Sequence, residues 1–178
     1  MKQLDGTGMK RLHREWRRRT EGRLALVLDD VQGPFNVGAI IRTAAALRVD
    51  DVWLAGRTPE PDDTKVGKTA LGTQRYLSFQ RVDDPVAAIG AARTAGYRVV
   101  GVELADSARP LHELSLGDAT CLVVGHEDRG LSAATLDACD DVAYLPLLGK
   151  VGSLNVATAA AIACYEARRQ RWADAPST

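Results

Sequence analysis

The chain has 178 residues, enough for one domain with a single well-formed core. Its residues are 46% hydrophobic and 26% charged, and no apolar stretch approaches the roughly 18 residues of a membrane span or resembles a signal peptide. We therefore expect a soluble, cytoplasmic protein. Lys and Arg number 23, as do Asp and Glu, so the net charge of zero lacks the overall basic excess that is typical of nucleic-acid-binding proteins.

The first predicted element is a basic helix at about residues 9–20. Residues 10–19, KRLHREWRRR, hold most of the positive charge near the N-terminus. Such a cluster can attract phosphate even on a neutral molecule. Trp16 within it suits stacking on a base or ribose, but it could equally pack on the body of the protein. The segment therefore predicts either a phosphate-binding helix or a solvated one.

Short apolar runs then alternate with helix-like segments to the C-terminus. Strands are predicted at residues 24–29, 51–56, 75–79, 97–104, 120–125 and 142–146, and helices from near residue 36, at 84–95, at 132–138 and at 153–172. Asp84 and Ser132 are suited to cap their helices. The alternation predicts an α/β fold, with a mostly parallel sheet and helices on both faces, in a single domain that spans residues 1–178.

Several common site motifs are missing from the sequence. It contains no G-x-G-x-x-G after the first strand, no G-x-x-x-x-G-K-[ST] and no G-x-S-x-G. The histidines (His13, His112 and His126) and the cysteines (Cys121, Cys139 and Cys164) lack metal-ligand spacing. These absences argue against a Rossmann dehydrogenase, a P-loop NTPase, a serine hydrolase and a zinc enzyme. We expect no metal, and small buried thiols in a reducing compartment.

Three strand-to-helix junctions remain, and the first is GPFNVGAIIRTAAAL at residues 33–47. Asn36 is placed to precede and cap the helix, and Gly38 would let another backbone approach closely. Arg42 follows about two turns later, on a stretch that we expect to be buried. Its guanidinium could extend to solvent, or it could form a fork for a phosphate at the carboxyl edge of the sheet.

The second junction is LVVGHEDRGLS at residues 122–132. A strand ends at Gly125, an acid follows at Glu127, and Gly130 is placed in the turn with a positive φ. Taken alone, this pattern is typical of an ordinary loop with a solvated carboxylate.

The third junction is the segment 145–171, LPLLGKVGSLNVATAAAIACYEARRQR. Ser153 and Asn155 stand at the expected helix start. The small residues before them would expose backbone N–H groups to a ligand such as an adenine ring or a carboxylate. The alanines that follow permit close helix packing, either at a dimer interface or within the monomer core.

Together and in this order, NVGAIIRTA, VVGHEDRGL and the third segment resemble the three signature motifs of the SpoU (TrmH-like) branch of the SPOUT methyltransferases. The resemblance covers residues from about 10 to 172. It implies a C-terminal deep trefoil knot, a homodimer with an active site that forms across it, and S-adenosyl-L-methionine (AdoMet) as methyl donor, with S-adenosyl-L-homocysteine as product.

The resemblance also assigns roles to individual residues. Main-chain contacts with AdoMet are implied for Gly125, Leu145 and Leu154, with Ser153 beside them, and Leu104 and Leu147 would line the pocket. The polar active-site positions correspond to Asn36, Arg42, Glu127, Ser153 and Asn155. The resemblance implies that Arg42 is the catalytic residue and also contacts RNA. Five arginines of the basic helix are further predicted RNA contacts: Arg11, Arg14, Arg17, Arg18 and Arg19.

The implied reaction is 2′-O-methylation of a ribose in RNA, with tRNA, as in the guanosine 2′-O-methyltransferases, ranked before rRNA. Two other readings stay open. One is an RNA-binding protein that keeps the fold without catalysis, although it would have no need of the whole polar set. The other is a methyltransferase of the same fold that acts on a small molecule or on another RNA atom, which the basic N-terminal helix disfavours.

Overall fold

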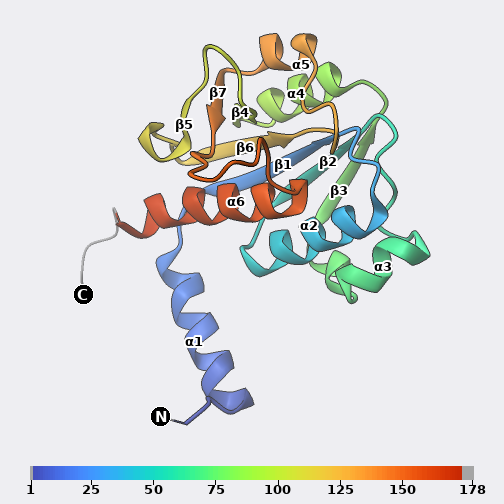
Figure 1. Cartoon of the computed structure of the whole chain (residues 1–178). Helices are drawn as coiled ribbons and strands as arrows, with labels where there is room; N and C mark the ends of the chain where they lie inside the picture. Colours follow the sequence, from blue (N-terminus) through green and yellow to red (C-terminus); the bar gives the residue numbers. More distant parts are fainter. Residues whose placement is uncertain (1, 174–178) are drawn as a thin grey trace.

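The computed structural model describes residues 2–173, and a seven-stranded parallel sheet forms its centre (Figure 1). The strand order is β3-β2-β1-β6-β4-β7-β5, and every paired strand runs parallel to its neighbour. The strands are β1 (Arg23–Asp29), β2 (Asp51–Ala55), β3 (Ser78–Val82), β4 (Arg98–Val102), β5 (Arg109–Pro110), β6 (Ala119–Val124) and β7 (Asp141–Tyr144).

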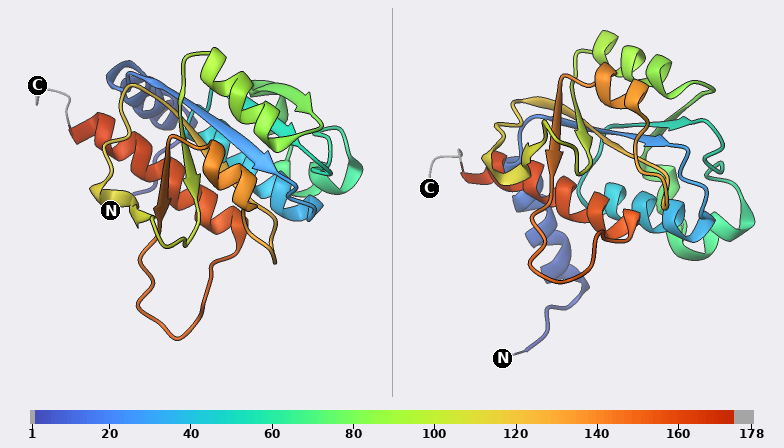
Figure 2. Two further views of the ribbon diagram at one scale, coloured as in Figure 1. Left: turned by 90° about the horizontal axis from the view of Figure 1, so that it is seen from above. Right: turned by 45° about the horizontal axis from the view of Figure 1, so that its top comes forward.

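Helices cover both faces of the sheet, as predicted (Figures 1 and 2). One face carries α2 (Pro34–Ala46), α3 (Thr64–Ala70) and α6 (Val156–Ala173), and the other carries α4 (Pro85–Thr94) and α5 (Ala133–Ala138). Short 3-10 turns occupy Thr73–Tyr76 and Leu111–Glu113. The α/β class with a mostly parallel sheet is confirmed.

The central strands are apolar on both sides because helices bury both of their faces. In β1, Leu26 and Leu28 join the core beneath α2 and α6, whereas Ala25 and Val27 join the core beneath α4. Alternate residues of a strand point to opposite faces, so one short run of sequence supplies two cores.

The predicted caps of the two helices on the second face are confirmed. The Asp84 carboxylate accepts the backbone N–H groups of Val86 and Ala87, and the Ser132 hydroxyl accepts that of Thr135. Both side chains satisfy amides that the first turn of a helix leaves without intrahelical partners.

Gly38 lets two helices approach closely, also as predicted. A Cβ on Gly38 would collide with the Val66 carbonyl and the Thr69 hydroxyl of α3, and it would lie 3.0 Å from the Ala70 nitrogen. Helix α3 itself is not predicted from the sequence, which reads as a polar loop up to residue 64.

Several predicted boundaries are wrong. The strand expected at 75–79 begins only at Ser78, because Leu71 and Gly72 adopt left-handed conformations and lead into a 3-10 turn. Helix α2 begins at Pro34, so Asn36 lies inside its first turn and does not cap it. Helix α6 begins at Val156 and not at Ser153.

The C-terminal part of the sheet has an interleaved order. β7 lies between β4 and β5, which are consecutive along the chain, and the segment from β7 to α6 forms a long loop that extends from the body (Figure 2). This order is compatible with the threaded arrangement that the resemblance implies. The trefoil knot itself stays a prediction.

The basic helix α1 (Gly6–Arg19) projects from the rest of the molecule, and none of its residues is buried (Figure 1). It begins earlier than the predicted residue 9, because the Asp5 carboxylate accepts the Gly8 N–H at 2.7 Å. The rings of Trp16 and Trp172 join it to α6 at a centroid distance of 5.2 Å. Within residues 2–173 no helix is both long and apolar enough to cross a membrane.

Candidate active site

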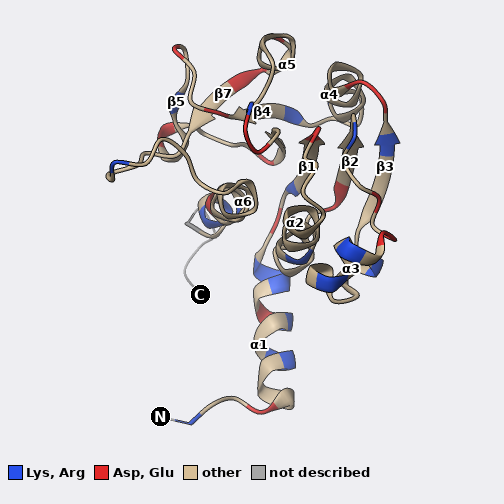
Figure 3. Cartoon of the chain, turned by 45° about the vertical axis from the view of Figure 1, so that its right-hand side comes forward, with Lys and Arg blue, Asp and Glu red and all other residues tan. Residues whose placement is uncertain are grey.

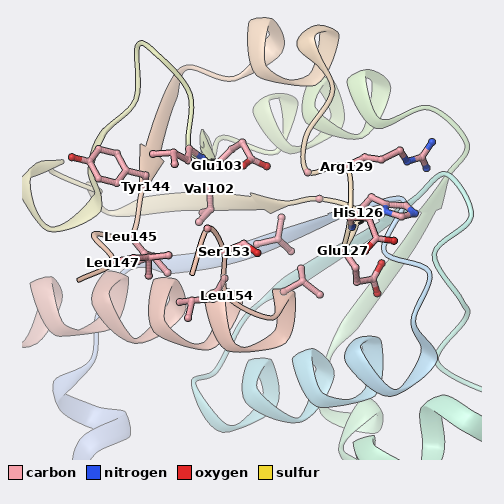
Figure 4. Close-up of a pocket in the computed structure, with 18 of the residues that line it drawn as sticks. Val102, Glu103, His126, Glu127, Arg129, Tyr144, Leu145, Leu147, Ser153 and Leu154 are labelled. Carbon is pink, nitrogen blue, oxygen red and sulfur yellow. Dashed lines mark hydrogen bonds between the residues drawn. The ribbon is translucent and has the colours of Figure 1, made fainter. Parts of the chain in front are cut away.

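A cavity of about 540 Å³ opens beyond the carboxyl ends of β4, β6 and β7 (Figure 4). Three segments enclose it: 102–104 after β4, 124–130 after β6, and the loop 144–154 that precedes α6. Ligands of open parallel sheets usually bind at this edge, because the loops that follow the strands converge there.

All six predicted cofactor residues line this one cavity. Four of them are leucines from the first and third segments, and the other two are a glycine and a serine: Leu104, Gly125, Leu145, Leu147, Ser153 and Leu154. Leu104 stands at the rim, with 69% of its surface exposed. The tertiary structure therefore brings together positions that lie up to 50 residues apart in the sequence.

The second signature segment folds into a tight loop that only glycine permits at two positions. A Cβ on Gly125 would lie 2.5 Å from the carbonyl carbon of Gly130. Gly130 has a φ of +63°, as predicted, and the carboxylate of Glu103 occupies the space that its Cβ would need. The loop closes when the Gly130 N–H donates to the His126 carbonyl at 2.9 Å.

Glu127 is held by three donors and is not a merely solvated acid. Its Oε1 accepts the Gly33 N–H at 2.8 Å and the Asn36 side-chain N–H at 2.9 Å, and its Oε2 accepts the Gln32 N–H at 3.2 Å. Burial opposes ionisation, but these hydrogen bonds outweigh it and lower the pKa of Glu127. At neutral pH Glu127 is an ionised acceptor.

Asn36 and Asn155 extend this contact into a relay of polar side chains. Because Asn36 donates to Glu127, its Oδ1 faces Asn155 and accepts the amide N–H of that residue at 2.9 Å. The Oδ1 of Asn155 in turn accepts the N–H of Ala157 at 3.0 Å and that of Thr158 at 3.3 Å, and so caps α6. Three of the five predicted polar residues are therefore joined in one chain.

Ser153 and Arg42 lie outside this relay. Ser153 is exposed and lines the cavity. Arg42 is exposed rather than buried, and it does not line the cavity. At 100° per residue, six positions along α2 rotate Arg42 by 240° from Asn36, so its side chain leaves another side of the helix.

The predicted RNA-binding arginines of α1 are all exposed, and they form a basic stretch on the projecting helix (Figure 3). Helical geometry places residues 11, 14 and 18 on one side, and the partly exposed Met9, Leu12 and Trp16 on another. Trp16 packs on Trp172 and stays 40% exposed, and its stacking on RNA stays a prediction.

Three charged residues that line the cavity are absent from the prediction: Glu103, Asp128 and Arg129. Glu103 lines the cavity, and its carboxylate accepts the N–H groups of Leu104 and Leu131, each at 3.0 Å. Arg129 also lines the cavity and reaches Asp30 at 2.8 Å. The one local signal that could have indicated Glu103 is its position as a carboxylate at a strand end. Arg129 has no such local signal, because its partner Asp30 lies 99 residues away.

Potential metal ligands are not clustered. Among residues 2–173 no group of three His, Cys, Asp or Glu side chains is arranged to hold a metal ion.

The sequence matches a family model described as the SpoU rRNA Methylase family over residues 23–165. The 23S rRNA (guanosine-2′-O-)-methyltransferase RlmB of Acinetobacter baylyi is 35% identical over 83% of this chain and 60% of its own length. Across such curated relatives the chain spans only about 39% to 60% of their length.

Solved structures give the same likeness. The SpoU methyltransferase AviRb of Streptomyces viridochromogenes, in complex with AdoMet, has a TM-score of 0.77 and 32% identity over 86% of this chain and 62% of its own. A structure described as giving insights into the 2-OH methylation of C/U34 on tRNA has a TM-score of 0.75 and 31% identity over 84% of this chain and 96% of its own.

Proposed function

Because the chain belongs to the SpoU rRNA methylase family, we propose that it methylates a ribose 2′-hydroxyl of RNA with AdoMet as methyl donor. The observation that carries the proposal is the single cavity to which all three signature segments contribute, either in its lining or through the polar relay at its edge. A chain that only bound RNA would have no use for this arrangement.

The cavity residues fit AdoMet in size and in chemistry. A volume of about 540 Å³ lies within the usual range of small-molecule sites, about 300–1,000 Å³. Leu145, Leu147 and Leu154 offer apolar walls for an adenine ring, and Gly125 and Ser153 leave backbone groups accessible. When bound there, AdoMet would supply an electrophilic methyl group and leave as S-adenosyl-L-homocysteine.

The protein's own residues position the substrate and stabilise charge. The relay of Glu127, Asn36 and Asn155 holds three loops in place beside the cavity. A guanidinium carries only N–H donors and no acceptor, so Arg42 cannot serve as a simple base. Arg42 instead holds an RNA phosphate and stabilises the 2′-alkoxide that develops as the hydroxyl loses its proton to solvent.

Arg42 does not line the cavity of its own chain, and a homodimer would let it reach the cavity of the second copy. An exposed apolar strip is available for the second copy: it runs from Met9, Leu12 and Trp16 on α1 to Ile162 and Tyr165 on α6. The strip is continuous, because Trp172 contacts both Trp16 and Tyr165, with ring centroids 5.2 and 5.5 Å apart. Arg42 of each protomer would then act on RNA at the cavity of the other.

Within RNA, tRNA is the favoured substrate and the cytoplasm the favoured location. The structure described as giving insights into the 2-OH methylation of C/U34 on tRNA is 31% identical over 84% of this chain, which supports a tRNA substrate. The exposed arginines of α1 add the phosphate contacts that a folded RNA requires. Ribosomal RNA is the alternative.

The test is methyl transfer from radiolabelled AdoMet to total tRNA and, separately, to ribosomal RNA, followed by nuclease digestion and nucleoside analysis. We expect a 2′-O-methylated nucleoside from one pool. Arg42→Ala should reduce turnover by at least about 100-fold, which is typical for loss of a group that stabilises a developing oxyanion. Arg42→Lys should recover little, because it keeps the charge but loses the planar fork.

Arg93→Gln serves as the control. Arg93 lies on α4, away from the cavity, where it is exposed and pairs with Asp140. Full turnover in Arg42→Lys would contradict the proposed role of Arg42. No transfer to either pool, with AdoMet still bound, would favour an RNA-binding protein without catalysis.

A further inference from the structure

Two arginines share one carboxylate at the carboxyl end of β1. Arg57 binds Asp30 through two nitrogens, with Nε–Oδ1 at 3.2 Å and Nη2–Oδ2 at 2.9 Å. Arg129 binds the same Oδ2 at 2.8 Å. The Arg57 guanidinium holds the pKa of Asp30 far below its ordinary value, so the carboxylate remains ionised.

The loop that carries Arg57 is held rigidly on both sides. Arg81 donates to the carbonyls of Gly56 and Thr58, which flank Arg57 in the sequence. The buried Thr58 hydroxyl accepts the Val31 N–H at 3.1 Å and donates to the neighbouring backbone. The position of the Arg57 side chain is therefore set before any ligand arrives, which lowers the entropic cost of binding.

These ion pairs lie at the surface and contribute little to stability. The side chains of Arg57 and Arg129 are 67% and 62% exposed, and exposed pairs are typically worth about 0–1 kcal/mol. Two guanidinium groups on one carboxylate leave an excess positive charge. Within the part of the chain that the structure describes, Nη1 of Arg57 and both Nε and Nη1 of Arg129 have no partner.

The pair also reaches the rim of the cavity, through Arg129. Arg129 lines the rim of the cavity, on the side of His126 and Glu127 and away from Tyr144 and Leu145 (Figure 4). Beyond β2 and β3 this edge of the sheet carries both basic and acidic segments (Figure 3). The backbone amides of Gln32 and Gly33, next to Asp30, hold Glu127. One short segment thus positions both the arginine pair and the active-site relay.

We propose that Arg57 and Arg129 form a phosphate-binding pair that holds the RNA backbone beside the target ribose. The proposal rests on the proposed function, and it adds a contact on the sheet edge that is separate from helix α1 and Arg42. Planar guanidinium forks whose free N–H groups face solvent match the geometry of phosphate oxygens. The carboxylate of AdoMet is the other oxyanion within reach, and the experiment separates the two.

The experiment compares Arg57→Gln, Arg129→Gln and the double variant with the wild-type protein. Binding of total tRNA and of ribosomal RNA is measured from low to moderate salt, and AdoMet binding is measured by calorimetry. For the RNA pool that binds more tightly, we expect the double variant to lose affinity on the order of tenfold or more. The slope of log K against log salt should fall by about 1 for each arginine removed. AdoMet affinity should stay within about twofold of wild type.

Arg93→Gln is the matched control, because Arg93 on α4 also contacts an aspartate through two nitrogens, at 3.1 and 2.8 Å, next to the start of β7 and away from the cavity. It should leave both affinities and the salt slope unchanged. Equal RNA affinity and an equal slope in the double variant would overturn the proposal. A loss of AdoMet affinity without loss of RNA affinity would also overturn it and assign Arg129 to the cofactor.

The outcome does not depend on methyl transfer. If wild-type protein transfers no methyl group but binds RNA through this pair, the proposed reaction fails and the phosphate contact stands. Thermal unfolding of each variant shows whether a lost affinity reflects a lost fold.

Discussion

Glu127 determines which way two amide side chains of the site face. Its carboxylate can only accept hydrogen bonds, so Asn36 must turn its nitrogen toward Glu127 and its oxygen toward Asn155. Asn155 is then left with an oxygen that caps α6. A single ionised group therefore orients a relay that reaches from one strand end to the start of a helix on the other side of the cavity.

Glu127→Gln tests this dependence. A glutamine nitrogen would face at least one of the three N–H donors, and loss of hydrogen bonds to a charged acceptor should lower the free energy of unfolding by about 2 kcal/mol at pH 7. Urea denaturation measures the difference, and Glu113→Gln, on an exposed turn, should change it by less than about 0.5 kcal/mol.

The same prediction has a pH dependence. The folded-state pKa of Glu127 lies below its ordinary value of 4.5, so its stabilisation is complete above that value and is lost as the pH falls through the folded pKa. The gap in stability between wild type and Glu127→Gln should narrow below pH 4.5. A gap that is independent of pH would show that Glu127 acts through packing alone.

At the scale of helices, Arg168 connects the two elements that carry the site. Arg168 is 2% exposed, and its guanidinium donates to the carbonyls of Leu47 at 2.9 Å, Gly22 at 3.0 Å and Arg48. Leu47 and Arg48 follow the last turn of α2, so an arginine of α6 satisfies carbonyls that end another helix. This contact holds α2, which carries Asn36 and Arg42, against α6, which Asn155 caps.

Arg168→Met is expected to destabilise the protein by on the order of 3 kcal/mol, because it leaves three partly buried carbonyls without this donor. Arg169→Met is the matched control on the next residue. Arg169 is exposed and, among residues 2–173, forms an ion pair with Glu166 alone, so its loss should cost less than about 1 kcal/mol. Chemical denaturation of both variants gives the comparison, and similar losses would contradict the capping role.

At the scale of the whole molecule, the proposed homodimer lets a second copy supply Arg42 to the site. The alanines of α6 do not decide the interface by themselves, since Ala160 and Ala163 pack in the core of their own chain. The outward residues Ile162 and Tyr165 are 43% and 54% exposed, and they are the side chains available to a partner.

Tyr165→Glu should therefore convert a dimer to a monomer, because it places a charge in the centre of an apolar contact. Sedimentation velocity should show the lower mass, and methyl transfer should fall together with it while AdoMet binding persists. Tyr76→Glu is the control, as Tyr76 is 64% exposed near α3, on another part of the surface. A Tyr165→Glu protein that remains dimeric would show that α6 does not form the interface.

The sequence by itself determined the alternation of strands and helices, the caps at Asp84 and Ser132, and the close approach at Gly38. Each of these depends on residues near one another in the chain, where apolar periodicity and capping chemistry act locally. The three signature segments likewise indicated five of the six predicted cofactor residues and the polar set, because each segment is a contiguous string, whereas Leu104 lies outside them.

Only the tertiary structure decided the rest. The sequence predicts Asn36 as a helix cap and Ser153 at the start of a helix. In the fold, the Asn36 amide instead contacts Glu127 and Asn155. Asn155, and not Ser153, caps α6. The arginine pair on Asp30 joins residues 27 and 99 positions apart, and Arg168 reaches carbonyls 120 positions away. Such partners are set by strand order and helix packing. The residues next to a charged side chain in the sequence do not reveal whether it contacts solvent, a distant carbonyl or a phosphate.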